Sequence, residues 1–308
     1  MKDLFKNATY TIVTALLLLL VMPAAAAEFR KGADASSGRA YFVLDGEISP
    51  GDAKAFNELL HRDLYFLANA RGVLVNSSGG DVLEAIKIAE TVERVGLPIE
   101  VAVDGECSSA CFFIYVAAPH RSAYGVVKIH APYYNLAGVE AREYANYAQA
   151  SRLVHESTRA FLLGRSVPSD LIEKMLSMSS TGAYSLTIDD RNRIGYESAF
   201  IREYGAQKCG GYRSDRLMTM EEVRRYRDCS EDFLVDARLS HIWGDKSHQA
   251  KVGLREVGLA FANRVQNSPT LSDAQKFAIQ QDLSEIVTTS QPETWLERFD
   301  HYLKGIRL

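Results

Sequence analysis

The chain has 308 residues and a formal net charge of −4 at pH 7, with 24% charged and 47% hydrophobic residues. A nucleic-acid-binding domain needs a basic surface, so this balance excludes nucleic acid as the expected partner. The length is enough for one large domain with an appendage.

The first 27 residues have the three parts of a secretory signal peptide. Two lysines precede an uncharged, mostly apolar run over residues 11–22, and a run of alanines ends at Ala27. We expect cleavage after Ala27 and a periplasmic or otherwise exported protein. Residues 1–27 carry two lysines and one aspartate, a net +1, so the mature chain would have a charge of −5. The alternative is an uncleaved membrane anchor, because the apolar run approaches the lower length limit of a membrane-spanning helix. No later segment has about 18 uncharged apolar residues, so we expect no membrane span after cleavage.

Strand and helix patterns alternate in the next part of the chain. A strand is predicted over 39–48, and Ser49 before Pro50 predicts the start of a helix over 49–62. The short β-branched run GVLVN, 72–76, predicts a buried strand. An amphipathic helix over 81–95 and a second buried strand over 99–103 follow.

Two knots of small residues lie at the ends of these strands. SSGG, 77–80, follows the strand 72–76, and CSSAC, 107–111, follows the strand 99–103. Strand, helix and strand at this spacing form a βαβ unit, whose strands are parallel. The carboxyl ends of parallel strands open on one edge of the sheet, where α/β proteins place their ligands. We therefore expect the two knots to lie side by side.

A third strand over 125–130 ends in His130, which would join the same edge if this strand is also parallel. Before it, the apolar stretch 109–118 predicts a buried helix. Beyond residue 135 the sequence predicts a long helix over 139–167, a helix over 168–178, and a short helix followed by an edge strand over 185–201. From Ser230 the chain is mostly helical, with breaks near 267–269 and 291–292. The expected organisation is a signal peptide 1–27, an α/β domain 28–205 and a mostly helical extension 206–308.

The four cysteines lie in the part predicted to be exported, where thiols are oxidised. Cys209 and Cys229 bracket a loop, and we predict a disulfide between them. Cys107 and Cys111 form either a local disulfide or two packed thiols. A zinc site there would need two further ligands that are not found nearby in the sequence, so no metal is expected.

Four groups in these loops suggest acyl-transfer chemistry, which needs a nucleophile, a base and two N–H donors facing the oxyanion. Ser109, His130 and the N–H groups of Gly80 and Ala110 would supply these parts. Each group also has an ordinary structural interpretation. Glycines at 79–80 make tight turns, Ser109 precedes a helix and could cap it, and a histidine after a strand is often structural.

Three segments resemble the proteolytic subunit of the Clp protease, within the ClpP/crotonase-like superfamily: VLVNSSGGDVLEAIKIAETV, GECSSACFF and VVKIHAPYY. The resemblance covers roughly residues 39–199. It implies an α/β fold of repeated β-β-α/β-α-β units with a mainly parallel sheet, Ser109 as nucleophile, His130 as base, and Gly80 and Ala110 as the oxyanion hole. It further implies a peptide or protein substrate, assembly of copies through the long helix, and no cofactor. The C-x-S-A-C motif is also similar to that of a group of exported bacterial proteins.

The sequence departs from the family at the acid that orients the histidine. Ala183 is at that place, and Asp189 and Asp190 fall at a helix start, where capping explains them. A triad without its acid loses orders of magnitude in rate. The chain is then a Ser-His dyad, an enzyme with an acid from elsewhere, or an inactive binding protein. A Ser-Lys pair using Lys128, which shares a strand face with His130, is a further alternative.

We therefore predict a serine hydrolase, most consistent with a peptidase, over a catalytically inactive binding or assembly protein. Crotonase-type acyl-CoA chemistry is disfavoured, because an exported protein would not meet cytosolic CoA.

Overall fold

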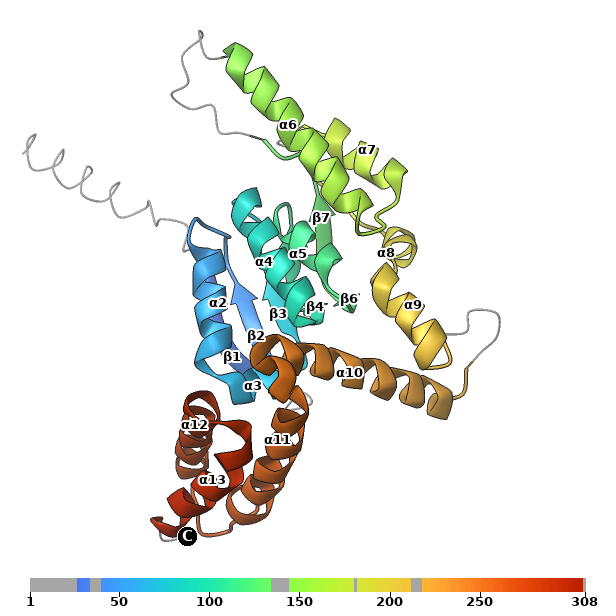
Figure 1. Ribbon diagram of the computed structural model, residues 1–308. Helices are drawn as coiled ribbons and strands as arrows, with labels where there is room; N and C mark the ends of the chain where they lie inside the picture. The colour runs from blue at the N-terminus through green and yellow to red at the C-terminus, as the bar shows by residue number, and fades with distance from the viewer. Residues whose placement is uncertain (1–26, 34–39, 134–143, 180–181, 212–217, 307–308) are drawn as a thin grey trace, which may run out of the picture.

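The computed structural model describes residues 27–33, 40–133, 144–179, 182–211 and 218–306 (Figure 1). The predicted signal peptide, apart from Ala27, lies outside the described residues. Within these ranges, no helix combines the length and the apolar character needed to cross a bilayer. Strands and helices alternate up to about residue 130, and helices dominate the rest of the chain.

A five-stranded sheet forms the centre of the α/β part, in the order β1-β2-β3-β4-β6. Strand β1 is antiparallel to β2, and the other neighbours are parallel. The predicted strands correspond to β2, β3 and β4, whereas β1 and β6 were not predicted. The bounds are β1 Glu28–Ala33, β2 Ala40–Asp45, β3 Val73–Asn76, β4 Ile99–Val101 and β6 Arg121–Ala123.

A second sheet consists of three short strands that come after β4 in the chain. Its order is β5-β7-β8, with β5 (Glu106–Ser108) parallel and β8 (Tyr184–Ser185) antiparallel to β7 (Val126–Ile129). A parallel bridge between Ser77 and Cys107 connects it to the first sheet. This corrects two predictions: the CSSAC knot extends from β5, not directly from β4, and His130 follows a strand of the smaller sheet. Three-residue strands are too short to leave a periodic pattern in a sequence.

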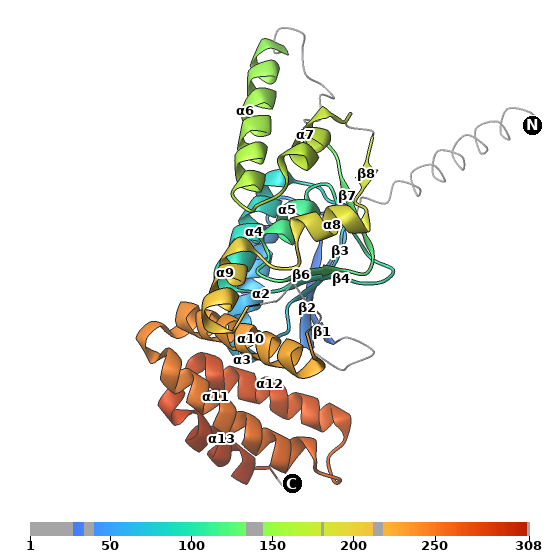
Figure 2. The same cartoon turned by 90° about the vertical axis from the view of Figure 1, so that its right-hand side faces the viewer.

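Helices α2, α4 and α5 lie together on one side of the five-stranded sheet (Figure 2). Helix α4 begins after Asp81, whose carboxylate accepts from Glu84 N–H, and ends at Gly96, as its caps predict. Helix α2 begins after Gly51, two residues later than predicted. Every residue of α5 is buried, which confirms the predicted central helix. The bounds are α2 Asp52–Arg62, α3 Leu64–Asn69, α4 Val82–Val95 and α5 Cys111–Ala117.

Four helices follow the smaller sheet: α6 Tyr144–Leu163, α7 Ser169–Ser177, α8 Ile188–Ile194 and α9 Ala199–Lys208. Residues 139–143 of the predicted long helix lie outside the described residues. The edge strand predicted before residue 201 is reduced to one antiparallel bridge between His120 and Glu197. Ser198 accepts a hydrogen bond from the N–H of Ile201 and caps a helix, α9, at this place.

The C-terminal region is helical, with α10 passing beneath the sheet and α11, α12 and α13 packed together beyond it (Figure 1). A disulfide between Cys209 and Cys229 connects the end of α9 to α10, as predicted. Helix α10 contacts α3 and α4, and α12 contacts α3. The bounds are α10 Met220–Trp243, α11 Ser247–Phe261, α12 Asp273–Thr289 and α13 Trp295–Lys304, with short helical turns at Gly244–Lys246, Ala262–Gln266 and Pro292–Thr294.

A mixed α/β fold with a mainly parallel sheet is thus confirmed. The repetition of β-β-α and β-α-β units and the domain boundary at 205/206 stay predictions.

Candidate active site

The two knots of small residues lie against each other through their backbones. Ser77 N–H donates to Glu106 O at 2.7 Å, and Ser108 N–H donates to Ser77 O at 2.9 Å. Gly79 has a φ of +104°, and a Cβ at this position would lie 2.5 Å from Ser109 Cβ. Only glycine permits both this conformation and this approach. The predicted juxtaposition of SSGG and CSSAC is therefore confirmed.

Two backbone N–H groups at this contact have no acceptor among the described residues, those of Gly80 and Ala110. Their neighbours are paired: Gly79 N–H donates to Ser77 Oγ at 3.2 Å, and Asp81 N–H donates to Ile48 O at 2.8 Å. Ala110 is fully buried, and a buried N–H without an acceptor is uncommon in proteins. An oxyanion hole consists of such donors, held ready for a negative oxygen.

Ser109 directly precedes Ala110 in the second knot. Its backbone is in the left-handed region, with a φ of +55°. Non-glycine residues seldom adopt this conformation, and strained backbone is frequent at active sites. Helix α5 has Ala110 as its N-cap and no side-chain cap, so the capping interpretation of Ser109 is wrong. Within the described residues, the Oγ of Ser109 makes no hydrogen bond. Ser109 is partly exposed as a residue.

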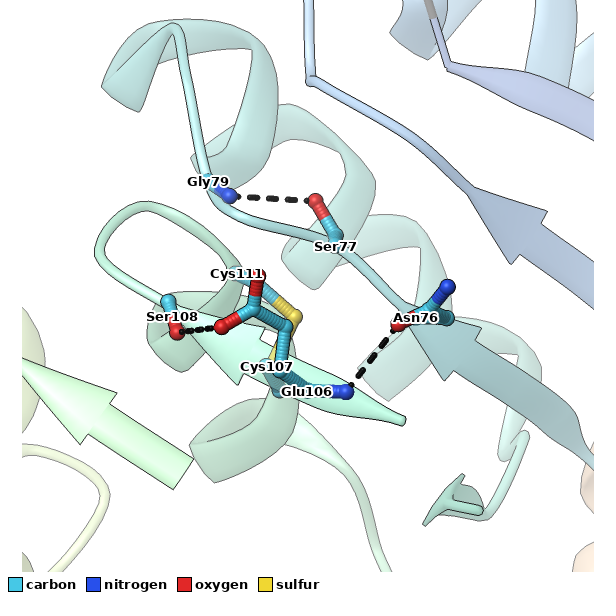
Figure 3. Close-up of a disulfide and its surroundings, with 7 residues drawn as sticks. All are labelled: Asn76, Ser77, Gly79, Glu106, Cys107, Ser108 and Cys111. Atoms are coloured by element: carbon cyan, nitrogen blue, oxygen red, sulfur yellow. Dashed lines mark hydrogen bonds between the residues drawn. A yellow bond between two sulfur atoms is a disulfide. The ribbon is translucent and has the colours of Figure 1, made fainter. Parts of the chain in front are cut away.

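The neighbouring Ser108 has a structural role. Its side chain is buried, and its Oγ donates to Glu106 Oε2 at 2.9 Å (Figure 3). Lys128 Nζ donates to the same carboxylate oxygen at 2.9 Å. The Lys128 ammonium, and to a lesser degree Ser108, lowers the pKa of Glu106. An ammonium paired with a carboxylate is a poor proton acceptor, so this pairing weighs against a Ser-Lys mechanism with Lys128 as base.

His130 directly follows β7. The backbone of β7 holds Ser109 in place. Ser109 N–H donates to Lys128 O at 3.0 Å, two residues before His130. The Nδ1 of His130 is 2.9 Å from Ala131 O. Among the described residues, no hydrogen bond joins His130 to Ser109. The topology thus places His130 two residues beyond the carbonyl group that Ser109 N–H binds.

Ala183, where the resemblance implies the acid, directly precedes β8. Strand β8 pairs with β7 through Lys128↔Ser185 and Ile129↔Tyr184. The paired residues end at Ile129 and Tyr184, one residue short of His130 and Ala183. The methyl group of Ala183 offers no acceptor to the imidazole.

The nearby Asp190 caps helix α8, as predicted. Its Oδ2 accepts from Thr187 N–H at 2.9 Å, from Thr187 Oγ at 2.8 Å and from Tyr184 Oη at 2.8 Å. Burial raises the pKa of Asp190, but these hydrogen bonds more than offset that effect, so the pKa lies below its usual value. Asp189 is exposed on the same helix.

Cys107 and Cys111 form a disulfide, which excludes both the thiol and the zinc interpretations. Both cysteines are fully buried, and the ring that they close contains Ser108, Ser109 and Ala110 (Figure 3). The bond therefore ties the first residue of α5 to β5 across the strained turn at Ser109.

We expect Cys107→Ala/Cys111→Ala to lower the free energy of unfolding by about 2 kcal/mol, from loop entropy, and to slow labelling of Ser109 by a fluorophosphonate. The turn at Ser109 would lose the crosslink that restrains it. Urea unfolding and labelling rates measure the two effects. Cys209→Ala/Cys229→Ala is the matched control: it should cost about 3 kcal/mol, because its loop is longer, with an unchanged labelling rate. Equal labelling rates in both double variants would contradict a positioning role of the Cys107–Cys111 bond.

No protein-family model and no curated protein matches the sequence. Two similar solved structures are a mutant of ClpP1 from Listeria monocytogenes and a mutant of a membrane-bound stomatin-specific protease. The first is 20% identical, with a TM-score of 0.38, covering 50% of this chain and 86% of that one. The second is 13% identical, with a TM-score of 0.35, covering 50% and 75%. Both likenesses extend over half of this chain.

Two participants in the site were missed from the sequence. Glu106 is two residues before Ser108 on β5, so both side chains share a face, but that strand left no pattern to find. The carbonyl of Ala131 belongs to the backbone, and residue types carry no signal for it.

Proposed function

We propose that the protein is an exported serine hydrolase of the ClpP-like type, acting on peptides. Ser109 is the nucleophile, His130 the general base, and the N–H groups of Gly80 and Ala110 form the oxyanion hole. The observation that carries the proposal concerns the contact of the two knots, where the N–H groups of Gly80 and Ala110 have no acceptor among the described residues. Ser109 lies in this contact in a left-handed conformation, and its hydroxyl has no hydrogen-bond partner in the same part of the chain. The two disulfides and the predicted signal peptide support export.

The proposed reaction follows from these groups. His130 Nε2 takes the proton of Ser109 Oγ as that oxygen attacks the substrate carbonyl carbon. The carbonyl oxygen, now negative, accepts from the N–H groups of Gly80 and Ala110. The imidazolium then gives its proton to the leaving amine, and water hydrolyses the acyl-enzyme with His130 again as base.

A second candidate is a catalytically inactive binding or assembly protein. It is favoured by Ala183, which has no carboxylate where the resemblance implies the acid. It is also favoured because no hydrogen bond joins Ser109 to His130 among the described residues. In that case the unpaired N–H groups would bind a peptide carbonyl or carboxylate without cleavage.

Labelling with a fluorophosphonate, detected by intact mass, distinguishes the two candidates. The purified protein should gain one adduct, which is lost in Ser109→Ala and after denaturation, and slowed by about 100-fold or more in His130→Ala. Ser108→Ala is the matched control, because it removes the neighbouring hydroxyl, and it should retain the adduct. A folded protein that gains no adduct would refute the hydrolase and leave the binding protein.

A further inference from the structure

The disulfide between Cys107 and Cys111 closes a small ring of backbone at the proposed site. It joins β5 to the first residue of α5 (Figure 3). The residues inside the ring are Ser108, Ser109 and Ala110, so the ring contains the proposed nucleophile and one of the proposed oxyanion donors. The oxidation state of the two cysteines therefore bears directly on the geometry of the site.

The strand side and the helix side of this ring are held in different ways. On the strand side, the N–H groups of Ser108 and Ser109 donate to backbone carbonyl oxygens at 2.9 and 3.0 Å. On the helix side, Ala110 is the N-cap of α5, and its own N–H has no acceptor among the described residues. A displacement of the start of α5 relative to β5 would therefore move the Ala110 N–H, while the two serine N–H groups stayed bound.

Reduction of the disulfide would force such a displacement. Both cysteines are fully buried and pack within the hydrophobic core. Bonded sulfur atoms lie about 2 Å apart, whereas heavy atoms that are in contact without a bond lie about 3.5–4 Å apart. A close-packed interior has no free space for this difference, so β5 and the start of α5 would have to separate. The dithiol form would then lack a correctly placed Ala110 N–H.

We infer that formation of the Cys107–Cys111 disulfide activates the site, and that burial then preserves the active form. The inference rests on the proposed function and names the condition under which that hydrolase works. The two thiols lose two electrons and two protons to a small disulfide such as glutathione disulfide, which becomes two thiols as the bond forms. The chain is then inactive where thiols are kept reduced and active after export.

The first test is labelling of Ser109 by a fluorophosphonate in protein that is unfolded, reduced and refolded in dithiothreitol. We expect labelling at least about tenfold slower than in the oxidised protein, because one oxyanion donor is displaced. The same chain refolded with glutathione disulfide is the control and should label at the native rate. A reduced, folded protein that labels at the native rate would overturn the inference. Cys107→Ala carries the same test if the reduced chain does not refold, since this variant cannot form the bond.

The second test is treatment of the folded, oxidised protein with dithiothreitol. Thiol–disulfide exchange needs access to a sulfur atom. Cys209 and Cys229 are partly exposed, whereas Cys107 and Cys111 are fully buried. The reductant should therefore open only the Cys209–Cys229 bond and leave the labelling rate unchanged, with free thiols counted by alkylation and intact mass. Release of all four cysteines from the folded protein would show that burial does not preserve the active form.

Hydrogen exchange in the first turn of α5 gives a readout that needs no activity. The N–H groups of Phe112 and Phe113 donate to Ser109 O and Ala110 O at 3.0 and 3.2 Å. We expect both amides to exchange at least about tenfold faster in the refolded dithiol form, because this turn loses its connection to β5. If no preparation were labelled but exchange changed in this way, the hydrolase proposal would fail while the oxidation-dependent geometry stood. Equal exchange in the two forms would overturn that geometry.

Discussion

Replacing Gly79 by alanine is expected to abolish labelling of Ser109 and to lower the free energy of unfolding by about 4 kcal/mol. Two costs add at this position. The φ of +104° is strained for any residue with a Cβ. The new Cβ would also lie 2.6 Å from Ser108 O and 3.0 Å from Ala110 N, which are backbone atoms and cannot rotate away. The two knots would have to separate, and the N–H groups of Gly80 and Ala110, the proposed oxyanion donors, would separate with them.

Gly51→Ala is the matched control for this experiment. Gly51 has nearly the same φ, +101°, but a Cβ there would have no atom within 4 Å. It should therefore show only the conformational cost, about 1–2 kcal/mol, and an unchanged labelling rate. Urea unfolding and labelling at a temperature where both variants are folded measure the difference. If Gly79→Ala behaved like Gly51→Ala, the close contact of the two knots would not be needed for the site.

The parts of the fold that could be predicted are those whose side chains carry a pattern. Helix α4 has an acidic N-cap, a helical apolar stripe and a glycine C-cap, and its bounds agree with the prediction within one residue. Strands β2, β3 and β4 are buried apolar runs. Strands β5, β6 and β8 have two or three residues each, too few for a period, and tertiary pairing alone determines them.

The contact between the two knots could be predicted from the sequence, whereas the backbone geometry at that contact could not. Order along the chain indicated that SSGG, CSSAC and His130 would converge, and the structure brings the two knots together. The left-handed turn at Ser109, the unpaired N–H groups and the carbonyl of Ala131 are backbone properties, so residue types do not reveal them. For Cys107 and Cys111, a spacing of four residues allowed both a bond and free thiols, and only the fold decided between them.

Arg238 attaches the C-terminal helices to the α/β part through a buried guanidinium. It is 3% exposed, and burial lowers the pKa of Arg238 to about 10, so the group is still charged at neutral pH. Nη1 donates to Leu67 O and Ala70 O at 3.1 and 2.9 Å, and Nη2 donates to Gly96 O at 3.2 Å. These carbonyls lie at the carboxyl ends of α3 and α4, where the helix dipole is negative. A cation from α10 thus satisfies acceptors that two helices leave open.

We expect Arg238→Met to lower the free energy of unfolding by about 3 kcal/mol, because methionine fills the space but leaves three buried carbonyls without a donor. Urea unfolding measures this loss. Arg224→Met, on the exposed side of α10, is the matched control and should change stability by less than about 0.5 kcal/mol. A loss no larger than that of Arg224→Met would show that α10 is held by its apolar contacts alone.

Labelling of the same variant connects this attachment to the site. Arg238 binds the carboxyl end of α4, whereas Gly80, the proposed oxyanion donor, precedes its amino end, 14 residues of helix away. If α4 is a rigid connection, Arg238→Met should destabilise the protein and leave the labelling rate of the folded state unchanged. A slower rate at full folding would mean that the C-terminal helices set the position of the SSGG knot, and residues 206–308 would then belong to the catalytic unit.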